Sequence, residues 1–155
     1  MTPAINQAKK AKIKFSIHEY KHSVNCNNYG MEAARELDVC KERIFKTLVI
    51  QLNDNRLAVG IIPVNSMLSM KHIAKAAGAK KAVMAEKNIV EKSTGYVLGG
   101  VSPLGQKRQL PTFVDSSAKN SPTIYVSAGK RGLEIELTSD DLLKMTRGTY
   151  QKICL

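Results

Sequence analysis

Cysteine, long apolar runs and acidic side chains are all scarce in this 155-residue sequence. The three cysteines, Cys26, Cys40 and Cys154, are odd in number and form no CxxC pair. This pattern indicates neither a disulfide framework nor a zinc ribbon, so we expect reduced thiols. No stretch approaches the roughly 18 apolar residues that a membrane span needs. The start, Met1-Thr2-Pro3, has no apolar signal core either, and we therefore expect a cytoplasmic protein.

The shortage of acidic residues leaves a strong positive charge. Lysine and arginine number 24 against 13 aspartates and glutamates, which gives a net charge of +11 at pH 7. Such an excess favours a polyanionic partner: nucleic acid, anionic lipid or an acidic protein. The sequence has no lipidation motif or polybasic amphipathic helix that would favour lipid, and charge alone does not choose further.

The chain length and the pattern of helix-like and strand-like segments predict one α+β domain over residues 1–155. Helix-like and strand-like segments interleave without a regular βαβ period, so we expect a mixed sheet with flanking helices. Helices are predicted over residues 3–12, 31–37, 70–77, 86–92 and 140–145. Strands are predicted over residues 15–20, 43–52, 56–62, 81–84, 111–115, 123–127 and 133–137. Loops are predicted over residues 25–30 and over the glycine-rich stretch 95–105.

Capping and turn residues define several of these boundaries. Thr2 followed by Pro3 is typical of a helix start. Ser69 can cap the third helix, and Gly78 can end it. Asn53-Asp54-Asn55 lies between two apolar, β-branched runs and predicts a hairpin.

Lys46 is the most informative single residue. In its predicted strand it shares a face with Ile44 and Leu48, and the opposite face carries Phe45 and Val49. Both faces look buried, so the ammonium must reach an anion, a cleft or the solvent. The alternative is a lysine near the strand start whose apolar stem simply extends to water.

Histidine and tyrosine residues follow the first predicted strand. His18, Tyr20 and His22 fall on one face if that strand continues. No carboxylate or cysteine completes a metal site there, so we expect no bound metal. Tyr20 could line a pocket with its hydroxyl, although a sheet tyrosine is more often structural.

Backbone rather than side chains could carry chemistry in the stretch Gly99-Gly100-Val101-Ser102-Pro103. Glycine permits close approach, and its N–H groups can stabilise an oxyanion. The alternative is an ordinary turn. The stretch is not a P-loop, because GxxxxGK[ST] is absent. No serine–histidine–acid or cysteine–histidine order is evident.

Two pairs of cations lie on predicted loops. Lys130-Arg131 joins two strands, and Lys107-Arg108 follows the glycine-rich stretch. Either pair could contact phosphate or simply be solvated.

Charged residues also alternate along the last predicted strand. Glu134 and Glu136 alternate with Leu133, Ile135 and Leu137. Both glutamates should therefore face away from the core, toward a cleft or the solvent.

Four segments carry a family resemblance. They are Phe45-Lys46-Thr47-Leu48, residues 92–96 (Lys-Ser-Thr-Gly-Tyr), residues 99–107 and residues 123–133. Together they resemble the YbaK family of bacterial Cys-tRNA(Pro) deacylases, which is related to the editing domain inserted in bacterial prolyl-tRNA synthetases. The similarity runs over nearly the whole chain.

The resemblance implies a mixed, barrel-like sheet surrounded by helices. It implies removal of cysteine from mischarged Cys-tRNA(Pro), with Cys-tRNA(Cys) as a further candidate, and no metal or organic cofactor. The implied partners are the 3′ end of aminoacylated tRNA and prolyl-tRNA synthetase. Editing of Ala-tRNA(Pro) by the same fold is one alternative, and a non-catalytic adaptor for tRNA and synthetase is another.

The resemblance also assigns residues. Lys46 matches the family's essential lysine, residues 99–103 match a GxxxP loop that holds the aminoacyl end, and Tyr20 matches a pocket tyrosine. Tyr29 stands where relatives often have phenylalanine, and Glu134 stands where aspartate is common. Both departures bear on the size of the pocket.

The chemistry implied by the family is assisted by the substrate. The thiol of the esterified cysteine attacks its own carbonyl, and the tRNA 3′ terminus leaves as a thiolactone forms. Lys46 would favour the thiolate or hold the terminal phosphate and ribose. The loop at Gly99 would stabilise the oxyanion.

Overall fold

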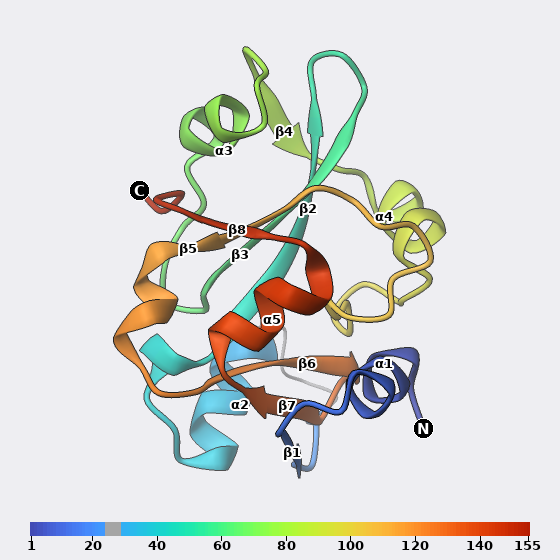
Figure 1. Ribbon diagram of the computed structural model, residues 1–155, viewed down its shortest axis with the longest axis vertical. Helices are drawn as coiled ribbons and strands as arrows, with labels where there is room; N and C mark the ends of the chain where they lie inside the picture. The colour runs from blue at the N-terminus through green and yellow to red at the C-terminus, as the bar shows by residue number, and fades with distance from the viewer. Residues whose placement is uncertain (24–28) are drawn as a thin grey trace.

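The computed structural model describes residues 1–23 and 29–155, and these form an α+β fold, as predicted (Figure 1). Cys26 and most of the loop predicted over residues 25–30 lie outside the described residues. The helices are α1 (Pro3–Ala11), α2 (Tyr29–Leu37), α3 (Met70–Ala76), α4 (Lys87–Thr94) and α5 (Ser139–Thr146). The strands are β1 (Ser16–Glu19), β2 (Phe45–Leu52), β3 (Leu57–Pro63), β4 (Ala82–Met84), β5 (Thr112–Asp115), β6 (Ile124–Lys130), β7 (Leu133–Leu137) and β8 (Thr149–Gln151). Short 3-10 turns span Lys41–Arg43 and Ser116–Asn120.

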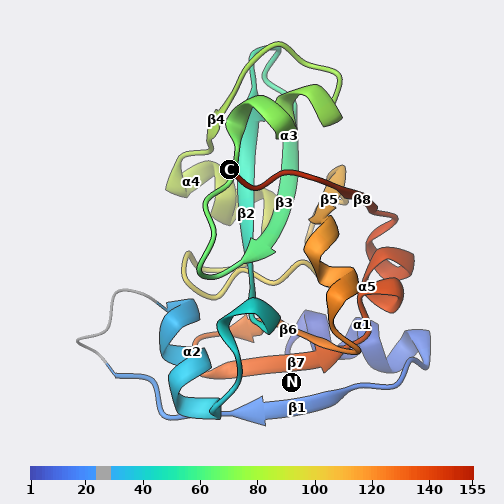
Figure 2. The same cartoon turned by 90° about the vertical axis from the view of Figure 1, so that its left-hand side faces the viewer.

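The described strands form two sheets, one of which is the mixed sheet that we expected, and neither closes into a barrel. The larger has the order β4-β2-β3-β5-β8 and is mixed, with antiparallel pairing around β2 and parallel pairing around β5. The smaller, β1-β7-β6, is antiparallel. Its strands run across the direction of β2 and β3 (Figure 2). A parallel bridge between Ile44 and Tyr125 joins the sheets, so they meet at the beginning of β2.

Local chemistry determined the helix starts as expected. The Thr2 hydroxyl accepts a hydrogen bond from the Ile5 N–H, with Pro3 in the first turn of α1. Ser69 caps α3 in the same way, accepting from the His72 N–H at 3.1 Å. These side chains occupy N–H groups that a helix start leaves without backbone partners.

The hairpin predicted at Asn53-Asp54-Asn55 is confirmed by the antiparallel pairing of β2 with β3. The sequence reading missed β8, a three-residue strand parallel to β5. Such a short edge strand has no apolar alternation to reveal it. The strand predicted over residues 123–127 was also too short, because β6 continues through Gly129 to Lys130.

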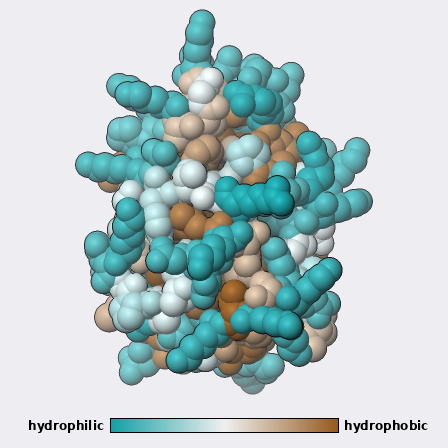
Figure 3. All heavy atoms as spheres, viewed as in Figure 1, coloured by the Kyte–Doolittle hydropathy of each residue, from teal (hydrophilic) through white to brown (hydrophobic). Residues whose placement is uncertain are grey.

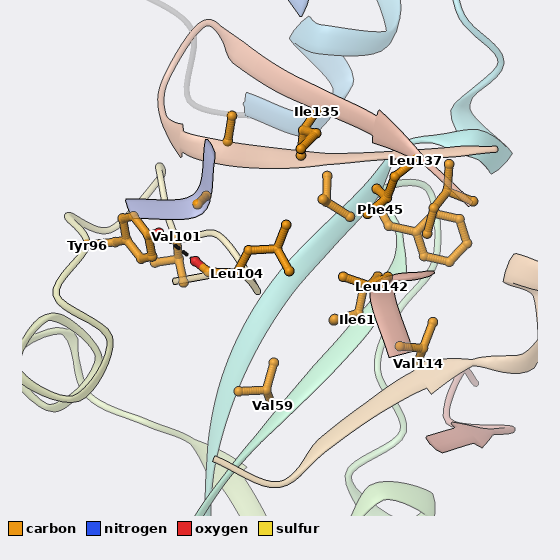
Figure 4. Close-up of a cluster of buried hydrophobic side chains, with 14 of the residues drawn as sticks. Phe45, Val59, Ile61, Tyr96, Val101, Leu104, Val114, Ile135, Leu137 and Leu142 are labelled. Carbon is orange, nitrogen blue, oxygen red and sulfur yellow. Dashed lines mark hydrogen bonds between the residues drawn. The ribbon is translucent and has the colours of Figure 1, made fainter. Parts of the chain in front are cut away.

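The main hydrophobic core lies between the two sheets. Phe45 and Ile61 reach it from the larger sheet, Ile135 from the smaller, and Leu142 from α5 (Figure 4). All four are at most 2% exposed. Helix α5 lies between β8 of the larger sheet and the smaller sheet in both ribbon views. This packing holds the start of β2 against the smaller sheet, which positions the site described next.

Charged and polar side chains project over most of the face shown in Figure 3, with small apolar patches between them. Among the described helices, none is long and apolar enough to cross a membrane.

Candidate active site

A cavity of about 440 Å³ opens where the two sheets meet. Its walls come from six parts of the chain: the residue after β1, the beginning of α2, the start of β2, the residue after β3, the loop after α4, and the β6–β7 hairpin. The lining residues are Tyr20, Tyr29, Gly30, Phe45, Lys46, Thr47, Leu48, Val64, Leu98, Gly99, Val101, Ser127, Lys130, Arg131 and Glu134. The structure therefore brings together residues that are more than 100 positions apart in the sequence.

Lys46 lies half-buried in the wall formed by β2. The prediction that both faces of this strand are buried is confirmed, since Ile44 and Phe45 are at most 2% exposed. Burial lowers the pKa of the Lys46 ammonium, and the Cys154 side chain acts in the opposite direction. Within residues 1–23 and 29–155, no hydrogen bond or ion pair of the Lys46 side chain is formed. The ammonium is thus available to a ligand.

Glu134 lies on β7 and is 7% exposed. As expected, it faces away from the main core, which Leu133, Ile135 and Leu137 enter, and toward a cleft. The face of the smaller sheet that carries Glu134 is nevertheless also interior. Helix α2 covers it, and Ala33, Ala34 and Tyr125 pack together there. Burial raises the pKa of Glu134 to about 8. No other described residue forms a hydrogen bond or ion pair with its carboxyl group.

Glu136, two residues further on, is in the opposite situation. Its carboxylate contacts His18 Nε2 at 2.9 Å and Arg43 at 3.4 Å, and it accepts a hydrogen bond of 2.5 Å from the Thr123 hydroxyl. Burial alone would raise the pKa of Glu136, but the hydrogen bonds from Thr123 and His18 lower it. Glu136 thus connects β7 to β1, to the residue before β6 and to the turn before β2, and it does not line the cavity.

Thr47 and Ser127 also line the cavity, and sequence reasoning did not select them. The Thr47 hydroxyl oxygen is buried and has no hydrogen-bond partner among the described residues. The Ser127 hydroxyl accepts from the Gly129 N–H at 3.1 Å. A signal existed for Thr47, because it is the polar residue between Phe45 and Val49 on an otherwise apolar strand face.

The glycine-rich loop contributes Gly99 to the cavity wall. Its φ of +95° is one that residues with a Cβ rarely adopt. A Cβ at this position would lie 2.6 Å from Tyr29 Cε2 and 2.7 Å from Arg131 Nε. The neighbouring Gly100 N–H is already used, donating to the Val97 carbonyl at 2.9 Å. Of the two glycine N–H groups predicted to face a ligand, Gly99 therefore offers the better candidate.

Side chains of the core anchor this loop from behind. The Tyr96 hydroxyl donates to the Leu104 carbonyl at 2.5 Å (Figure 4). Three residues predicted at the site, Gly100, Ser102 and Pro103, are not among the lining residues. Ser102 is fully buried and its hydroxyl accepts from the Leu104 N–H. Pro103 borders a separate, smaller cavity of about 180 Å³.

The predicted cation pairs separate in space. Lys130 and Arg131 line the cavity, and the Arg131 guanidinium lies 4.1 Å from the centre of the Tyr29 ring. Lys107 and Arg108 are exposed and lie outside the cavity. Their backbone N–H groups donate to carbonyls near the end of α4.

Helix α2, which carries Tyr29, is held in place by a buried side-chain hydrogen bond and by a close backbone approach. The Glu32 carboxylate, fully buried, contacts His22 Nδ1 at 2.6 Å and accepts from the Ser23 N–H at 2.9 Å. Gly30 lies so close to the residue after β3 that a Cβ there would overlap the Val64 side chain. Tyr20 is held by its N–H, which donates to the Gly132 carbonyl.

The histidines contact different carboxylates, His18 with Glu136 and His22 with Glu32. Within the part of the chain that the structure describes, no three histidine, cysteine, aspartate or glutamate side chains group closely enough to hold a metal ion. The cavity instead offers an ammonium, a carboxyl group, hydroxyls and a glycine N–H, a set suited to a polar organic ligand.

A comparison with known proteins finds a matching family model and similar proteins. The model of the aminoacyl-tRNA editing domain matches residues 27–145. An Enterococcus faecalis protein named "Putative Cys-tRNA(Pro)/Cys-tRNA(Cys) deacylase EbsC" is 38% identical over 152 residues, covering 98% of this chain and 92% of that protein. The uncharacterised Bacillus subtilis protein YwhH is 26% identical over 72% of this chain and 70% of its own length.

Solved structures show the same fold. The hypothetical protein APE2540 superposes with a TM-score of 0.89 at 22% identity, covering 99% of this chain and all of that one. A protein described as "a putative trans-editing enzyme for prolyl tRNA synthetase" superposes with a TM-score of 0.86 at 19% identity, covering 100% of this chain and 99% of that one.

Proposed function

We propose, from the premise that this chain belongs to the aminoacyl-tRNA editing domain family, that it is a deacylase that removes cysteine from mischarged Cys-tRNA(Pro). One observation carries the proposal: a cavity of about 440 Å³ brings Lys46 together with Gly99 and Glu134. The deacylase name of the Enterococcus relative supports the reaction, and its extensive similarity supports transfer to this chain.

The proposed reaction uses the thiol of the substrate as the nucleophile. The thiolate sulfur forms a bond to the carbonyl carbon of its own ester, and the bond from that carbon to the ribose oxygen breaks. The ribose oxygen leaves with the electron pair and takes up a proton. The products are deacylated tRNA and cysteine thiolactone, which water then opens to cysteine. Much of the rate comes from holding thiol and carbonyl together.

Lys46 has the properties that this step needs. A thiol has a pKa near 8.5, and a nearby ammonium favours the more nucleophilic thiolate. Lys46 is half-buried, lines the cavity and has its pKa lowered by burial. Its charge therefore acts in a partly desolvated place, where an electrostatic interaction is stronger than in water. Holding the terminal phosphate is the other role open to the same ammonium.

Gly99 is the proposed donor to the oxyanion. The tetrahedral intermediate carries negative charge on the former carbonyl oxygen, and a fixed N–H stabilises it. Gly99 lines the cavity, and no other backbone group in the described chain occupies its N–H.

Deacylation assays test the function. The wild-type protein should release cysteine from Cys-tRNA(Pro) much faster than it releases serine, alanine or proline from the same tRNA. Lys46→Ala should lower kcat/KM by about 100-fold or more, as expected for a group that stabilises charge in the transition state. Lys41→Ala, which removes an exposed lysine from the turn before β2, is the matched control and should keep full activity.

Each alternative has its own outcome in this assay. Preferential release of alanine would replace cysteine by alanine as the substrate. Tight binding of tRNA without release of any amino acid would identify an adaptor. Serine released as fast as cysteine would point to attack by water and would contradict the thiol mechanism.

The proposal also implies partners and a location. The substrate is a charged tRNA, so the protein would act in the cytoplasm, where translation takes place. The site addresses the aminoacyl end, which all tRNAs share in form. We therefore propose that selection of tRNA(Pro) depends on prolyl-tRNA synthetase as a partner.

A further inference from the structure

Glu134 is the most unusual group in the cavity. It is 7% exposed, and its carboxyl group finds no hydrogen-bond or ion-pair partner within residues 1–23 and 29–155. A buried acid without a partner is costly for folding, whether it is neutral or charged. Three cations, Lys46, Lys130 and Arg131, line the same cavity, yet none forms an ion pair with it. The carboxyl group is therefore placed for a ligand and not for the fold.

The chemistry of an aminoacyl-tRNA end limits which of its groups the Glu134 carboxyl group can bind. Its phosphates are anionic, the ribose and the adenine are neutral, and the cysteine side chain is a neutral thiol or an anionic thiolate. The α-ammonium is the one cationic group of the aminoacyl ester. Lys46, Lys130 and Arg131 repel an ammonium from their parts of the cavity wall, which leaves the wall at Glu134.

We propose that Glu134 binds the α-ammonium of the esterified amino acid, and that the protein therefore accepts only esters whose α-amine is free. This inference rests on the proposed function and adds a substrate class to it. N-acylated esters, the class that includes peptidyl-tRNA, are excluded, because an amide nitrogen carries no charge and would leave the acid unpaired.

Positions in the fold agree with this assignment. Glu134 comes from β7 in the smaller sheet, and Lys46 comes from β2 in the larger one. The two charges thus act from different walls of one cavity. An amino acid bound between them would place its ammonium at the acid and its thiol at the ammonium of Lys46.

The proton equilibrium of Glu134 is compatible with this role. Burial raises its pKa to about 8, so the acid is neutral at pH 7 when no cation is beside it. An α-amino group has a pKa of about 8 as well. The two groups can therefore share one proton as a hydrogen-bonded ion pair. Because their pKa values are similar, transfer of that proton from the acid to the amine costs little free energy.

A cycle of two proteins and two substrates tests the inference. The proteins are the wild type and Glu134→Gln, which keeps the shape of the side chain and removes its charge. The substrates are Cys-tRNA(Pro) and 3-mercaptopropionyl-tRNA(Pro), which retains the thiol and lacks the amine. The intrinsic reactivity of each ester cancels in this cycle, because both proteins act on the same esters.

We expect Glu134→Gln to lose activity only on the ester that carries an α-amine. Glu134→Gln should lower kcat/KM on Cys-tRNA(Pro) by about 30-fold or more, the usual effect of breaking a buried charge pair. On the mercaptopropionyl ester the two proteins should be equal within about 3-fold. The wild type should also be at least about 30-fold slower on N-acetyl-Cys-tRNA(Pro) than on Cys-tRNA(Pro). Equal penalties on both esters, or rapid cleavage of the N-acetyl ester, would overturn the inference.

Glu136→Gln is the matched control. It removes a carboxylate from the same strand and the same sheet face, outside the cavity. Whatever it does to stability, the ratio of rates on the two esters should stay at the wild-type value. A change in that ratio as large as the one in Glu134→Gln would also count against the inference.

Binding separates this inference from the proposed function. Calorimetry with 3′-deoxy-3′-(cysteinylamino)adenosine and its N-acetyl form needs no turnover. A free-amine preference that Glu134→Gln abolishes would support the inference even if Cys-tRNA(Pro) were not cleaved. Equal Kd values for the two forms would refute it, even if Cys-tRNA(Pro) were a good substrate.

Discussion

Glu134 and Glu136 are identical residues on one face of β7, and their surroundings give them opposite properties. The first is buried without a partner, and its pKa is raised to about 8. The second contacts Arg43 and His18, and its pKa is lowered. Alternation along the strand predicted that they share a face. It could not predict which of them would meet Arg43 and His18, because those two residues come from other parts of the chain.

Glu134→Gln should change how stability depends on pH. The folded-state pKa of Glu134 is raised from 4.5 to about 8, so the folded protein retains a proton that the unfolded chain has lost. Wild-type stability should fall as pH rises from about 4.5 to about 8, by on the order of a few kcal/mol. The variant lacks this contribution to the pH dependence. Urea unfolding at pH 5, 7 and 9 should show its advantage over wild type growing with pH.

Glu136→Gln should show the opposite sign. Its folded-state pKa is lowered, so its stabilising contribution is present above the unfolded-state pKa and is lost on acidification. The variant should be less stable than wild type at pH 7, with a difference that shrinks toward acidic pH. Parallel pH profiles for the two variants would contradict both assignments.

Thr47→Val should separate stability from activity. The Thr47 hydroxyl is buried without a partner among the described residues, and valine has nearly the same shape. Loss of an unsatisfied hydroxyl should raise the free energy of unfolding by about 1 kcal/mol. If the hydroxyl binds the substrate, kcat/KM should fall at the same time. A destabilised but fully active variant would show that the hydroxyl serves the fold.

At the scale of elements, the site depends on how the loop after α4 packs against its neighbours. The loop is anchored in the core by Tyr96, and at Gly99 it touches Tyr29 from α2 and Arg131 from the β6–β7 hairpin. None of these elements forms the wall of a cavity by itself. Together they form one wall of the cavity, and glycine is the residue that permits this contact.

Gly99→Ala should therefore damage the site more than the fold. The new methyl group would overlap Tyr29 and Arg131, and φ is +95°. We expect deacylation to fall by about 10-fold or more, since small displacements of positioned groups reduce rates strongly. Gly78→Ala is the control, because φ is +74° there and nothing lies within 4 Å of the new Cβ. It should lose about 1 kcal/mol of stability and keep its activity.

An unchanged rate in Gly99→Ala would show that the loop tolerates a Cβ and would remove Gly99 from the proposed oxyanion site. Circular dichroism of both glycine variants would establish that the comparison is made between folded proteins.

At the scale of the whole molecule, the net charge of +11 and the cavity of about 440 Å³ both suit the proposed tRNA substrate. Both sheets contribute walls to that cavity, and we propose that residues 1–155 act as one domain. Lys130 and Arg131 lie at the cavity, and Lys107 and Arg108 lie outside it on the surface. This distribution suits a substrate whose end is buried while the rest of it lies on the protein surface.

The salt dependence of KM tests this distribution. Each phosphate contact steepens the dependence, and two contacts correspond to about a 10-fold change between 50 and 200 mM salt. Removing both surface cations, Lys107→Ala with Arg108→Ala, should lower the slope of log KM against log salt by about 2 and leave kcat unchanged. The control pair Lys80→Ala with Lys81→Ala changes the net charge equally at other exposed positions. Equal slopes in the two double variants would show that Lys107 and Arg108 contribute only to the overall charge.

The sequence by itself determined the features that depend on neighbouring residues. The α+β class, the caps at Thr2 and Ser69 and the hairpin at Asn53–Asn55 follow from local periodicity and turn chemistry, and the structure confirms them. The sequence also marked Lys46, because a charged side chain stood out within an apolar strand.

Only the tertiary structure decided what surrounds those residues. It separated the sheets, covered the second face of the smaller sheet with α2 and so buried Glu134. It brought Gly99 to the cavity while leaving Ser102 and Pro103 outside. Burial and the absence of a partner arise from contacts between distant segments, and no local pattern encodes them. Lys46 was recognisable in the sequence, but only the packing of the two sheets formed the cavity around it and placed Glu134 in the same cavity.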